Sequence, residues 1–406
     1  MPSHISVLQE QMEDFRHSAK TRHIRLLEGV AFAADDEDAY HCFIKRPPYQ
    51  PVGRPLPCFF VLGEAGGRLP QDLHARLMNM GAQEKSPVIV LPSNGLDAPI
   101  AYDGPLLRQE AVLHIIAPLD NAASRSRGLL ESGMLAERRV LIAGLGSFGS
   151  SAAVELAKAG VGKFALVDMD RLEPGNIMRH QCGVADIGRF KTHAVRDAIL
   201  ARNPGAEVAT HELDLNTKLD LMLEEARDSD IVICLTDQGR SRFNCNTIAL
   251  AAGRPALYAR AITRAAGGDI FRFRPGGPCL SCLFAQGAAL GEDEIASIRS
   301  ASERTPDYAP PGADMALVQP GLACDIAPLV QMLVKLALVE LAPRGIGHWE
   351  RLREDLAAPF YIWANSRDDI YRDWKPMDYQ FNRNSIMRWY GVRVPRDEHC
   401  MSCSLA

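Results

Sequence analysis

Three glycines in the run GLGSFG have the spacing G-x-G-x-x-G: Gly144, Gly146 and Gly149. They follow the apolar run VLIA and precede an amphipathic segment. In that order such glycines permit a tight turn, close approach of a phosphate and close helix packing. A helix beginning at Ser147 and Phe148 would point its free N–H groups at the phosphate. Asp168 ends the next apolar run, where a carboxylate can accept hydrogen bonds from ribose hydroxyls. This pattern predicts a nucleotide site, and by itself it fits NAD, FAD and ATP equally well.

A cluster of acidic, basic and amide side chains lies within residues 168–191: Asp168, Asp170, Asn176, Arg179 and Lys191. Arginine and lysine neutralise charge that develops on leaving phosphates, and carboxylates hold magnesium. An enzyme that binds a triphosphate and releases pyrophosphate needs this set, whereas a dehydrogenase needs no such cluster beside its ribose acid. Taken singly, Arg179 and Lys191 are typical of solvated surface charges. Their joint spacing after a nucleotide loop favours phosphate chemistry.

Further motifs continue the pattern in chain order: Gly188-Arg-Phe-Lys191, Asn203-Pro204, Thr236-Asp237-Gln238, Arg242 and Asn246. Together with the glycine loop, Asp168-Met-Asp170 and Asn176-Ile-Met-Arg179, they resemble the ThiF/MoeB/HesA superfamily, the adenylating relatives of ubiquitin-activating enzymes. Three residues depart from the family pattern: Gly175 for Ser, His180 for Gln and Gln238 for Asn. The resemblance covers about residues 123–284 and 317–345, and the departures leave its charged members intact.

The resemblance implies a role for each matched side chain. Asp168 would hold the ribose, and Asp237 a magnesium ion. The remaining side chains of the implied ATP site are Asp170, Asn176, Arg179, Lys191, Thr236 and Arg242, of which Asn176, Arg179 and Lys191 would hold phosphates. The segment SRSRGLLESG (124–133) resembles the one whose arginine reaches the ATP of the neighbouring subunit, so we expect a homodimer in which Arg127 takes that part. The implied reaction is attack of a substrate carboxylate on the α-phosphate of ATP, which needs no general base because a carboxylate is ionised at neutral pH.

Four of the ten cysteines form two C-x-x-C pairs: Cys279 with Cys282, and Cys400 with Cys403. Two such pairs make a tetrahedral thiolate site for zinc, and closed four-thiolate sites are structural. We therefore expect zinc to hold the C-terminal tail against the sheet domain. Two unrelated pairs, or redox-active thiols, are the alternative interpretation.

A covalent transfer step would need a separate nucleophile. Cys324 lies near a predicted helix start, where a thiolate is favoured, and it is the candidate thiol. A buried core position is the alternative for Cys324, and Cys182 near the phosphate motif also fits core packing. The expected crossover loop, residues 285–316, contains no cysteine but offers hydroxyl groups that would need activation: Ser297, Ser300, Ser302 and Thr305.

Composition narrows the class of protein. The net charge is −5 and the pI about 6.1, so neither nucleic acid nor an anionic membrane is an expected partner. The N-terminus lacks the apolar core of a signal peptide, and the apolar stretch 321–343 carries Asp325, Lys335 and Glu340. We therefore expect a cytoplasmic protein in which that stretch is a buried helix.

The expected fold is α/β. Residues 123–406 should form a doubly wound, mostly parallel Rossmann-like sheet of the ThiF type. Its strands are expected at 139–143, 163–168, 205–210, 230–236, 256–261 and 268–274, with a long helix over about 321–342. Residues 1–122 should form a smaller α/β domain that binds the substrate or a partner. Its helical spacing runs from Val7 to Val30 and over 70–80, and its strands are expected at 58–63, 86–92 and 111–118. The run LGEAGG (62–67) is either a glycine turn or a degenerate nucleotide loop.

Three functions follow from these observations. The leading one is ATP-dependent adenylation of the C-terminal carboxylate of a small ubiquitin-like or sulfur-carrier protein, with transfer to a thiol or hydroxyl and a conjugating enzyme as further possibilities. The second is adenylation of a ribosomal precursor peptide, as in microcin-maturing relatives. An NAD-dependent oxidoreductase is the alternative of another class; it uses Asp168 but has no use for Arg179, Lys191 and Asp237. A non-catalytic scaffold would have no need of those charges either.

Overall fold

Two units make up the chain in this computed structural model, Met1–Arg125 and Ser126–Ala406. The structure describes residues 3–22, 25–33, 39–44, 51, 53–63, 69–93, 98–117, 132–262, 265–285, 321–367, 371, 373, 385–404. Arg127 and, except for Ala285 at the end of a helix, the expected crossover loop lie outside these residues. The predictions for both therefore stay predictions.

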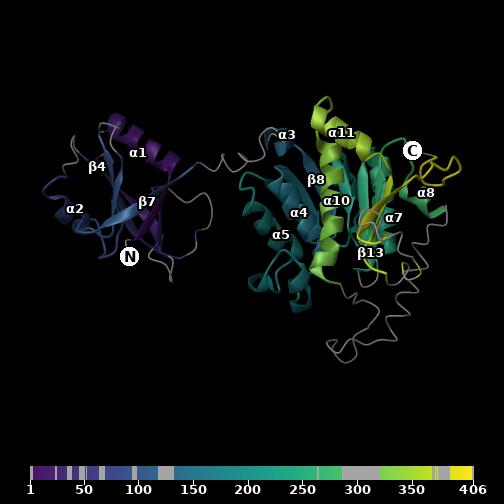
Figure 1. Cartoon of the computed structure of the whole chain (residues 1–406), viewed down its shortest axis with the longest axis horizontal. Helices are drawn as coiled ribbons and strands as arrows, with labels where there is room; N and C mark the ends of the chain where they lie inside the picture. Colours follow the sequence, from purple (N-terminus) through teal and green to yellow (C-terminus); the bar gives the residue numbers. More distant parts are fainter. Residues whose placement is uncertain are drawn as a thin grey trace. The chain divides into compact units, whose positions relative to one another are not determined.

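The second unit is built on one eight-stranded sheet with the order β10-β9-β8-β11-β12-β13-β14-β15 (Figure 1). Its strands are β8 (Arg139–Ala143), β9 (Lys163–Val167), β10 (Glu207–His211), β11 (Ile231–Cys234), β12 (Ala256–Ala261), β13 (Gly267–Phe273), β14 (Phe360–Ala364) and β15 (Arg388–Val392). The five strands from β10 to β12 are parallel. From β12 onward each strand is antiparallel to its neighbour.

The antiparallel part departs from the mostly parallel sheet that the sequence predicts. Only residues 262–266 join β12 to β13, and a parallel connection needs a crossover of a dozen or more residues. β13 must therefore turn back beside β12. β14 and β15, which the sequence analysis did not predict, come from the aromatic C-terminal region and extend the sheet as two further antiparallel strands.

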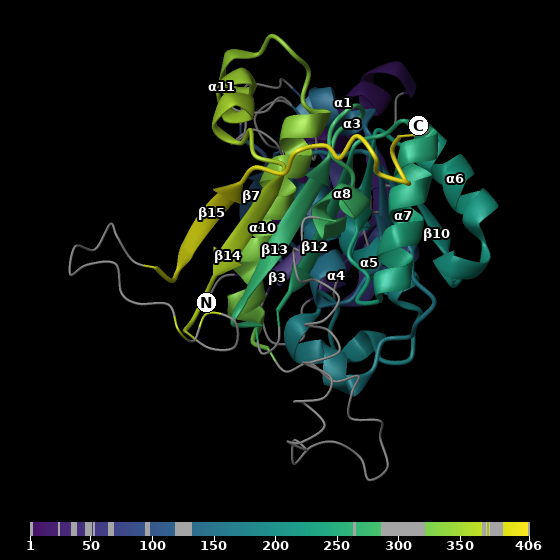
Figure 2. The ribbon, with the colours of Figure 1, turned by 90° about the vertical axis from the view of Figure 1, so that its right-hand side faces the viewer.

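Helices cover both faces of this sheet, since both faces of its strands are apolar. The helices are α3 (Ser132–Ala136), α4 (Ser147–Lys158), α5 (Lys191–Leu200), α6 (Leu219–Asp228), α7 (Gly239–Ala252), α8 (Leu280–Ala285), α10 (Ala323–Leu341) and α11 (Gly347–Asp355). Alternate residues of β8 enter separate cores: Ile142 packs with α4, α5 and α10, and Leu141 packs with α6, α7 and α8. α6 and α7 lie side by side on the second face (Figure 2). Continuous burial of this kind explains why the strands are unbroken apolar runs.

The long apolar helix α10 lies along α4 and contacts β11, β12 and β13. Its bounds agree with the helix expected over 321–342, and Leu329, Leu333 and Leu336 are fully buried. Among the helices that the structure describes, none has both the length and the apolar character to cross a bilayer.

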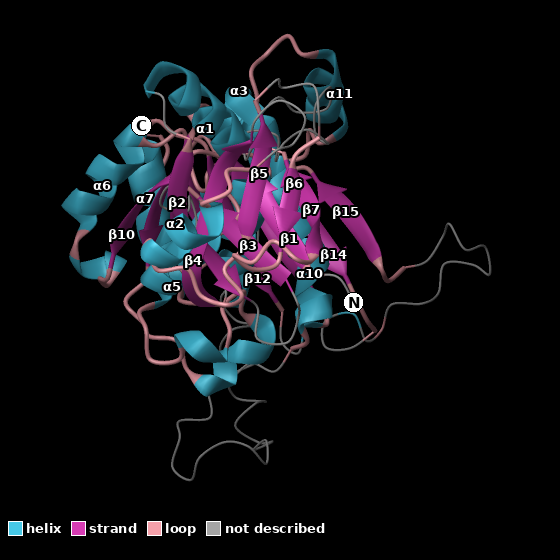
Figure 3. Cartoon of the chain, turned by 90° about the vertical axis from the view of Figure 1, so that its left-hand side faces the viewer, coloured by secondary structure: helices cyan, strands magenta, loops and turns pink. Residues whose placement is uncertain are grey.

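The strands of the first unit close into a barrel in the order β1-β3-β2-β4-β5-β6-β7, with β1 pairing with β7 (Figure 3). The strands are β1 (His4–Leu8), β2 (Leu26–Ala33), β3 (Ala39–Phe43), β4 (Arg54–Gly63), β5 (Val88–Pro92), β6 (Ile100–Tyr102) and β7 (Glu110–Ile116), and the helices are α1 (Gln9–Arg22) and α2 (Leu73–Asn79). Phe15 of α1 packs with Phe60, while Leu77 of α2 packs with Phe59. The unit is thus mixed α and β, with a closed barrel that the sequence did not predict.

The helical spacing from Val7 to Val30 proved wrong at both ends, since Val7 and Leu8 belong to β1 and the helix starts at Gln9. The helix ends at Arg22, and Leu26 begins β2, which pairs antiparallel with both β3 and β4. In the run LGEAGG, Leu62 and Gly63 end β4, and the rest lies outside the described residues.

Candidate functional site

The predicted nucleotide residues meet at the carboxyl ends of β8, β9 and β11. β8 is followed in the chain by β9 on one side of it, while β11 lies on its other side. This reversal of strand order is a topological switch point, the place where open α/β sheets bind ligands. The glycine loop follows β8, Asp168 follows β9, and Thr236-Asp237 follows β11.

At each of its three positions the loop needs glycine for a different steric reason. Gly144 has a φ of 89°, and a Cβ there would lie 2.8 Å from the backbone of Leu235. A Cβ on Gly149 would lie 1.9 Å from the carbonyl oxygen of Gly144, so only glycine lets α4 start this close to β8. A Cβ on Gly146, by contrast, would meet nothing within 4 Å. Gly146 therefore faces open space beside the α4 N-terminus, which is where a phosphate would approach.

Asp168 ties β9 to this loop. Its Oδ2 accepts a hydrogen bond from the N–H of Leu145 at 2.6 Å, and its Oδ1 accepts one from the N–H of Asp170 at 2.9 Å. Burial raises the pKa of Asp168, while the charge of Lys191 and these two N–H groups oppose that rise. Each carboxylate oxygen has a second lone pair, so the side chain can still accept from a hydroxyl group.

Short local contacts hold the cluster at the side chain of Lys191 and at the backbone of Arg179. Lys191 begins α5, is 9% exposed, and its Nζ lies 2.8 Å from Oδ2 of Asp170. The carbonyl of Arg179 accepts a hydrogen bond from Oγ of Ser147 at 2.8 Å, which joins the 3-10 helix η2 (Pro174–Arg179) to the start of α4. Asn176 stabilises the same short helix, since its Oδ1 accepts from the N–H of Glu173 at 3.0 Å. The Arg179 carbonyl thus joins the cluster to the glycine loop, and Lys191 lies beside Asp170, two residues after Asp168.

Phe148 packs inward, as does the fully buried Leu145 of the same loop. The Phe148 side chain is partly buried and packs against the core shared by α4, α5 and α10. Within the loop it can offer a nucleotide its backbone N–H rather than its ring.

His180 is a site residue that the sequence analysis noted only as a departure from the family pattern. Its Nδ1 accepts a hydrogen bond from the N–H of Cys182 at 3.0 Å, so the ring proton lies on Nε2. Nε2 then donates to the carbonyl of Leu145 at 2.9 Å, inside the glycine loop. Burial lowers the pKa of His180, as does the charge of Lys191, which keeps the ring neutral at neutral pH. His180 therefore acts as a fixed brace between the loop and the segment after Arg179.

The turn after β11 supplies the next group of predicted residues. Asp237 is exposed, and Thr236 is half-buried at the end of the strand. Nε of Arg242 donates to the Thr236 carbonyl at 2.9 Å, which anchors the turn to α7. Asn246, one helical turn further on, is 1% exposed, and its Oδ1 accepts from the N–H of Leu280 at 3.0 Å. Asn246 therefore links α7 to the segment that carries Cys279.

The thiols differ in exposure. Cys324, in the first turn of α10, is exposed, so a buried core position is wrong for this residue. Three residues earlier, a Cβ on Gly321 would lie 3.9 Å from Nη1 of Arg179, which brings the start of α10 close to the phosphate motif. Cys182 is buried, and burial raises the pKa of Cys182 to about 12. Cys42, Cys58, Cys234 and Cys245 are also buried.

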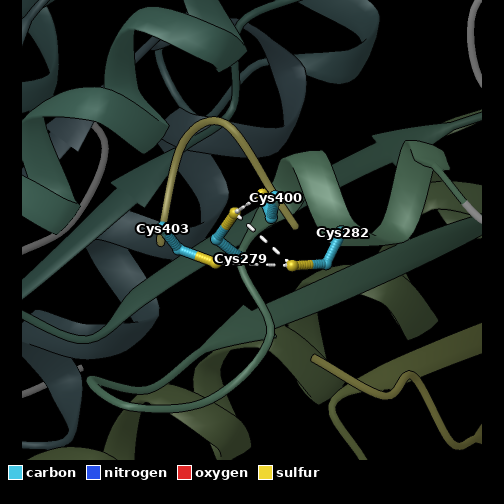
Figure 4. Close-up of side chains that lie close together, drawn as sticks. All are labelled: Cys279, Cys282, Cys400 and Cys403. Atoms are coloured by element: carbon cyan, nitrogen blue, oxygen red, sulfur yellow. Dashed lines mark hydrogen bonds between the residues drawn. The ribbon is translucent and has the colours of Figure 1, made fainter. Parts of the chain in front are cut away.

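The four C-x-x-C cysteines form one cluster (Figure 4). Their Sγ atoms lie within 4.8 Å of one another, although Cys279 and Cys400 are 121 residues apart. Neighbouring Sγ atoms are separated by 3.9, 3.6 and 3.5 Å. A tetrahedral zinc site with bonds of about 2.3 Å places its sulfur atoms about 3.8 Å apart. The cluster thus has the spacing to hold a metal ion, and unrelated pairs are excluded.

A model of the ThiF family matches residues 124–365, which is more than half of the chain. This chain belongs to the ThiF family. The matched residues include the glycine loop, the cluster around Arg179 and the Thr236-Asp237 turn.

Two named relatives match parts of this ThiF-family chain. The probable adenylyltransferase/sulfurtransferase MoeZ of Mycobacterium tuberculosis is 36% identical over 142 residues, 34% of this chain and 33% of MoeZ. The molybdopterin-synthase adenylyltransferase of Escherichia coli is 31% identical over 156 residues, 37% of this chain and 59% of that enzyme. The match thus spans about a third of MoeZ and somewhat over half of the E. coli enzyme.

A crystal structure of E. coli MccB with MccA is similar in part. It is 19% identical with a TM-score of 0.49, and the match covers 71% of this chain and 75% of MccB.

Proposed function

We propose that this chain is an ATP-dependent adenylyltransferase that acts on the C-terminal carboxylate of a small ubiquitin-like or sulfur-carrier protein or of a peptide. The proposal is supported by three charged residues near the ends of the central strands: Arg179, whose carbonyl contacts Ser147 at the start of α4, Lys191, which pairs with Asp170, and Asp237, which follows β11. An oxidoreductase would use the loop and Asp168 but would leave these three charges without a role. The named adenylyltransferases to which the chain is similar support the same conclusion.

In the proposed reaction a carboxylate oxygen of the substrate forms a bond to the α-phosphorus of ATP. The bond from that phosphorus to the oxygen bridging to the β-phosphate breaks, and pyrophosphate leaves with the electron pair. Asp168 would accept from the ribose, the N–H groups at the start of α4 would contact phosphate, and Arg179 and Lys191 would neutralise the leaving charge. Asp237, exposed at the end of β11, would hold Mg²⁺ together with the phosphates. The protein contributes position and charge, and no proton has to move.

The remaining roles complete the proposal. The four-cysteine cluster would hold Zn²⁺ as a structural ion, since a closed thiolate site leaves no open coordination position. Arg127 would act on the ATP of a second subunit in a homodimer, and residues 1–122 would bind the substrate or a conjugating partner. The parallel strands with helices on both faces would serve as a doubly wound nucleotide fold. Cys324, exposed close to the Arg179 side of the site, would be the thiol acceptor if the acyl group is transferred covalently.

The test is exchange of labelled pyrophosphate into ATP, with magnesium, in the presence of small proteins and peptides encoded beside this gene. We expect exchange with one of them and its loss when the last residue of that substrate is removed. Arg179→Ala and Asp237→Asn should each reduce exchange at least a hundredfold, since each removes a charge that stabilises the transition state. Arg202→Ala, at an exposed arginine beyond α5, is the matched control and should keep exchange. Tight NAD binding without ATP binding would refute the proposal.

A further inference from the structure

A carboxylate just after β10 holds the helix that carries Lys191. Glu212 follows His211, the last residue of β10, whose carbonyl accepts a hydrogen bond from the N–H of Asp168 at 3.2 Å. Glu212 therefore lies beside the end of β9, where the predicted ribose and phosphate residues begin. No step of the proposed reaction involves Glu212, yet its side chain is only 26% exposed.

Two consecutive side chains of α5 meet one oxygen of this carboxylate. Oγ1 of Thr192 donates a hydrogen bond to Oε1 of Glu212 at 2.6 Å, and Nε2 of His193 lies 3.1 Å from the same oxygen. A distance of 2.6 Å is typical of a hydroxyl that donates to an ionised carboxylate, which is a strong hydrogen bond. Burial would raise the pKa of Glu212, but hydrogen bonds from the side chains of Thr192 and Thr210 outweigh it and hold the pKa below its ordinary value. The carboxylate is thus ionised at neutral pH.

Thr192 is the more informative of the two α5 side chains, because it is fully buried. Threonine has the shape of valine with one methyl group replaced by a hydroxyl, and a buried hydroxyl destabilises the fold unless it is hydrogen-bonded. Packing alone would therefore favour valine here. A satisfied buried polar pair instead specifies one arrangement of the elements that carry it, which for Thr192 and Glu212 are α5 and the end of β10.

The arrangement of α5 decides where Lys191 points. Lys191 begins α5, and its N–H donates to the carbonyl of Asp170 at 3.0 Å, so its backbone is held on the β9 side. Glu212 holds the next two residues on the β10 side. Because successive residues of an α-helix are about 100° apart around its axis, a helix fixed at Thr192 and His193 also has a fixed direction for the Lys191 side chain.

The other ion pairs around α5 are weaker supports. Arg189 pairs with Asp186 and Asp197, and Arg196 also pairs with Asp197, through side chains that are between 23% and 45% exposed. Exposed ion pairs contribute little to stability. The hydrogen bond to Glu212 has a fully buried donor, so it is the stronger polar contact at the start of this helix.

We propose that Glu212 is a positioning residue for Lys191: by holding Thr192 at the start of α5, it keeps the Lys191 ammonium directed at the β- and γ-phosphates of ATP. The inference rests on the proposed adenylation, in which Lys191 acts on the leaving phosphates. Glu212 acts only through α5 and makes no contact of its own with the nucleotide.

The experiment measures the dissociation constants of ATP and of AMP, each with magnesium, by titration calorimetry on the full-length protein. AMP lacks the β- and γ-phosphates, so the ratio of the AMP constant to the ATP constant isolates the contacts that these phosphates make. A general loss of structure would weaken both nucleotides and leave the ratio unchanged, whereas a displaced Lys191 would lower it.

Lys191→Met should lower this ratio by about tenfold or more, the range for losing a hydrogen bond to a charged group. Thr192→Val keeps the shape but removes the hydroxyl, and it should lower the ratio by about threefold to tenfold, as should Glu212→Ala. Glu212→Gln should keep the ratio within about twofold, because its amide oxygen still accepts from Thr192. Glu207→Ala removes an exposed carboxylate at the other end of β10 and, as the matched control, should leave the ratio unchanged.

A double-mutant cycle tests whether Glu212 acts through Lys191. In the Lys191→Met background, Glu212→Ala should lower the ratio by less than about twofold further. An unchanged ratio in Thr192→Val and Glu212→Ala, or losses that multiply in the double variant, would overturn this inference and leave adenylation standing. No binding of ATP to the wild-type protein would count against adenylation itself, and the inference would fall with it.

Discussion

The brace formed by His180 gives the sharpest prediction from the structure. Replacing His180 with alanine removes the donor to the Leu145 carbonyl and the acceptor for the Cys182 N–H together. Both backbone groups lie where the chain is largely buried: Leu145 is fully buried and Cys182 is 5% exposed. Water cannot readily replace the lost partners there.

The magnitude follows from those two hydrogen bonds. A buried group left without its partner costs about 1–3 kcal/mol. We therefore expect His180→Ala to lower the free energy of unfolding of the second unit by about 2–4 kcal/mol, allowing for partial relaxation. For a unit of this size that corresponds to a melting temperature lower by roughly 3–7 °C.

Urea unfolding followed by tryptophan fluorescence measures the free energy of unfolding of the second unit, which contains His180. All four tryptophans lie between residues 349 and 389, so the signal reports on the second unit alone. His180→Gln is the matched variant, because its side-chain amide can donate to the Leu145 carbonyl and accept from the Cys182 N–H. We expect Gln to recover at least half of the stability that Ala loses, and ATP affinity to follow the same order.

The pH dependence provides a second test of the same brace. Burial lowers the pKa of His180 in the folded state, so the unfolded chain takes up the proton first, near the ordinary pKa of about 6.5. The stability from the neutral ring is therefore complete above pH 6.5 and is lost as the pH falls toward the folded pKa. The stability advantage of wild type over His180→Gln should shrink between pH 7.5 and 5. Equal stability of wild type and His180→Ala at pH 7.5 would refute the assigned tautomer and the brace.

Three further predictions concern other parts of the site. Gly146→Ala should weaken ATP binding at least tenfold at nearly unchanged stability, because its Cβ would occupy only the open space where a phosphate would approach. Gly149→Ala should instead lower the melting temperature by several degrees, because its Cβ would clash with the carbonyl of Gly144. Titration calorimetry with ATP measures the first effect, and thermal melts measure the second. Elemental analysis should find one zinc per chain, and chelation or Cys400→Ser should lower the melting temperature; no zinc and an unchanged melt would exclude a structural thiolate site. Cys324→Ala should keep pyrophosphate exchange and abolish any thioester that survives denaturation, so a thioester persisting in the variant would exclude this thiol.

The central parallel strands could be predicted because β8, β9 and β11 are nearly continuous apolar runs between helical patterns. The strands expected at 139–143 and 256–261 have those bounds in the structure. The barrel could not be predicted, since the spacing from Val7 onward stays helical past Arg22 while β2 contains Gly29 and alternates weakly. β14 and β15 could not be predicted, because their pairing depends on β13 turning back beside β12, which no local pattern reveals.

The candidate site, too, contains residues that could be predicted from the sequence and residues that could not. Residues that act through their own chemistry in a fixed spacing, such as Arg179 and Lys191, could be found from the sequence. His180 could not be assigned a role, because its partner Leu145 lies 35 residues away and becomes a neighbour only on folding. The ion pair between Arg260 and Asp269 depends on the register of β12 against β13, so no local pattern in the sequence predicts it.

The four-cysteine cluster also has a consequence for the order of events during synthesis. Its two halves are separated by 121 residues, so at about 5–20 residues per second the second pair leaves the ribosome roughly 6–24 s after the first. Through that interval the parallel strands and their glycine loop are already made, while Cys279 and Cys282 are reactive thiols without their partners. On the proposal that the four sulfurs hold zinc, these two sulfurs must stay reduced until Cys400 arrives, and an oxidising pulse during translation would damage newly made molecules more than finished ones.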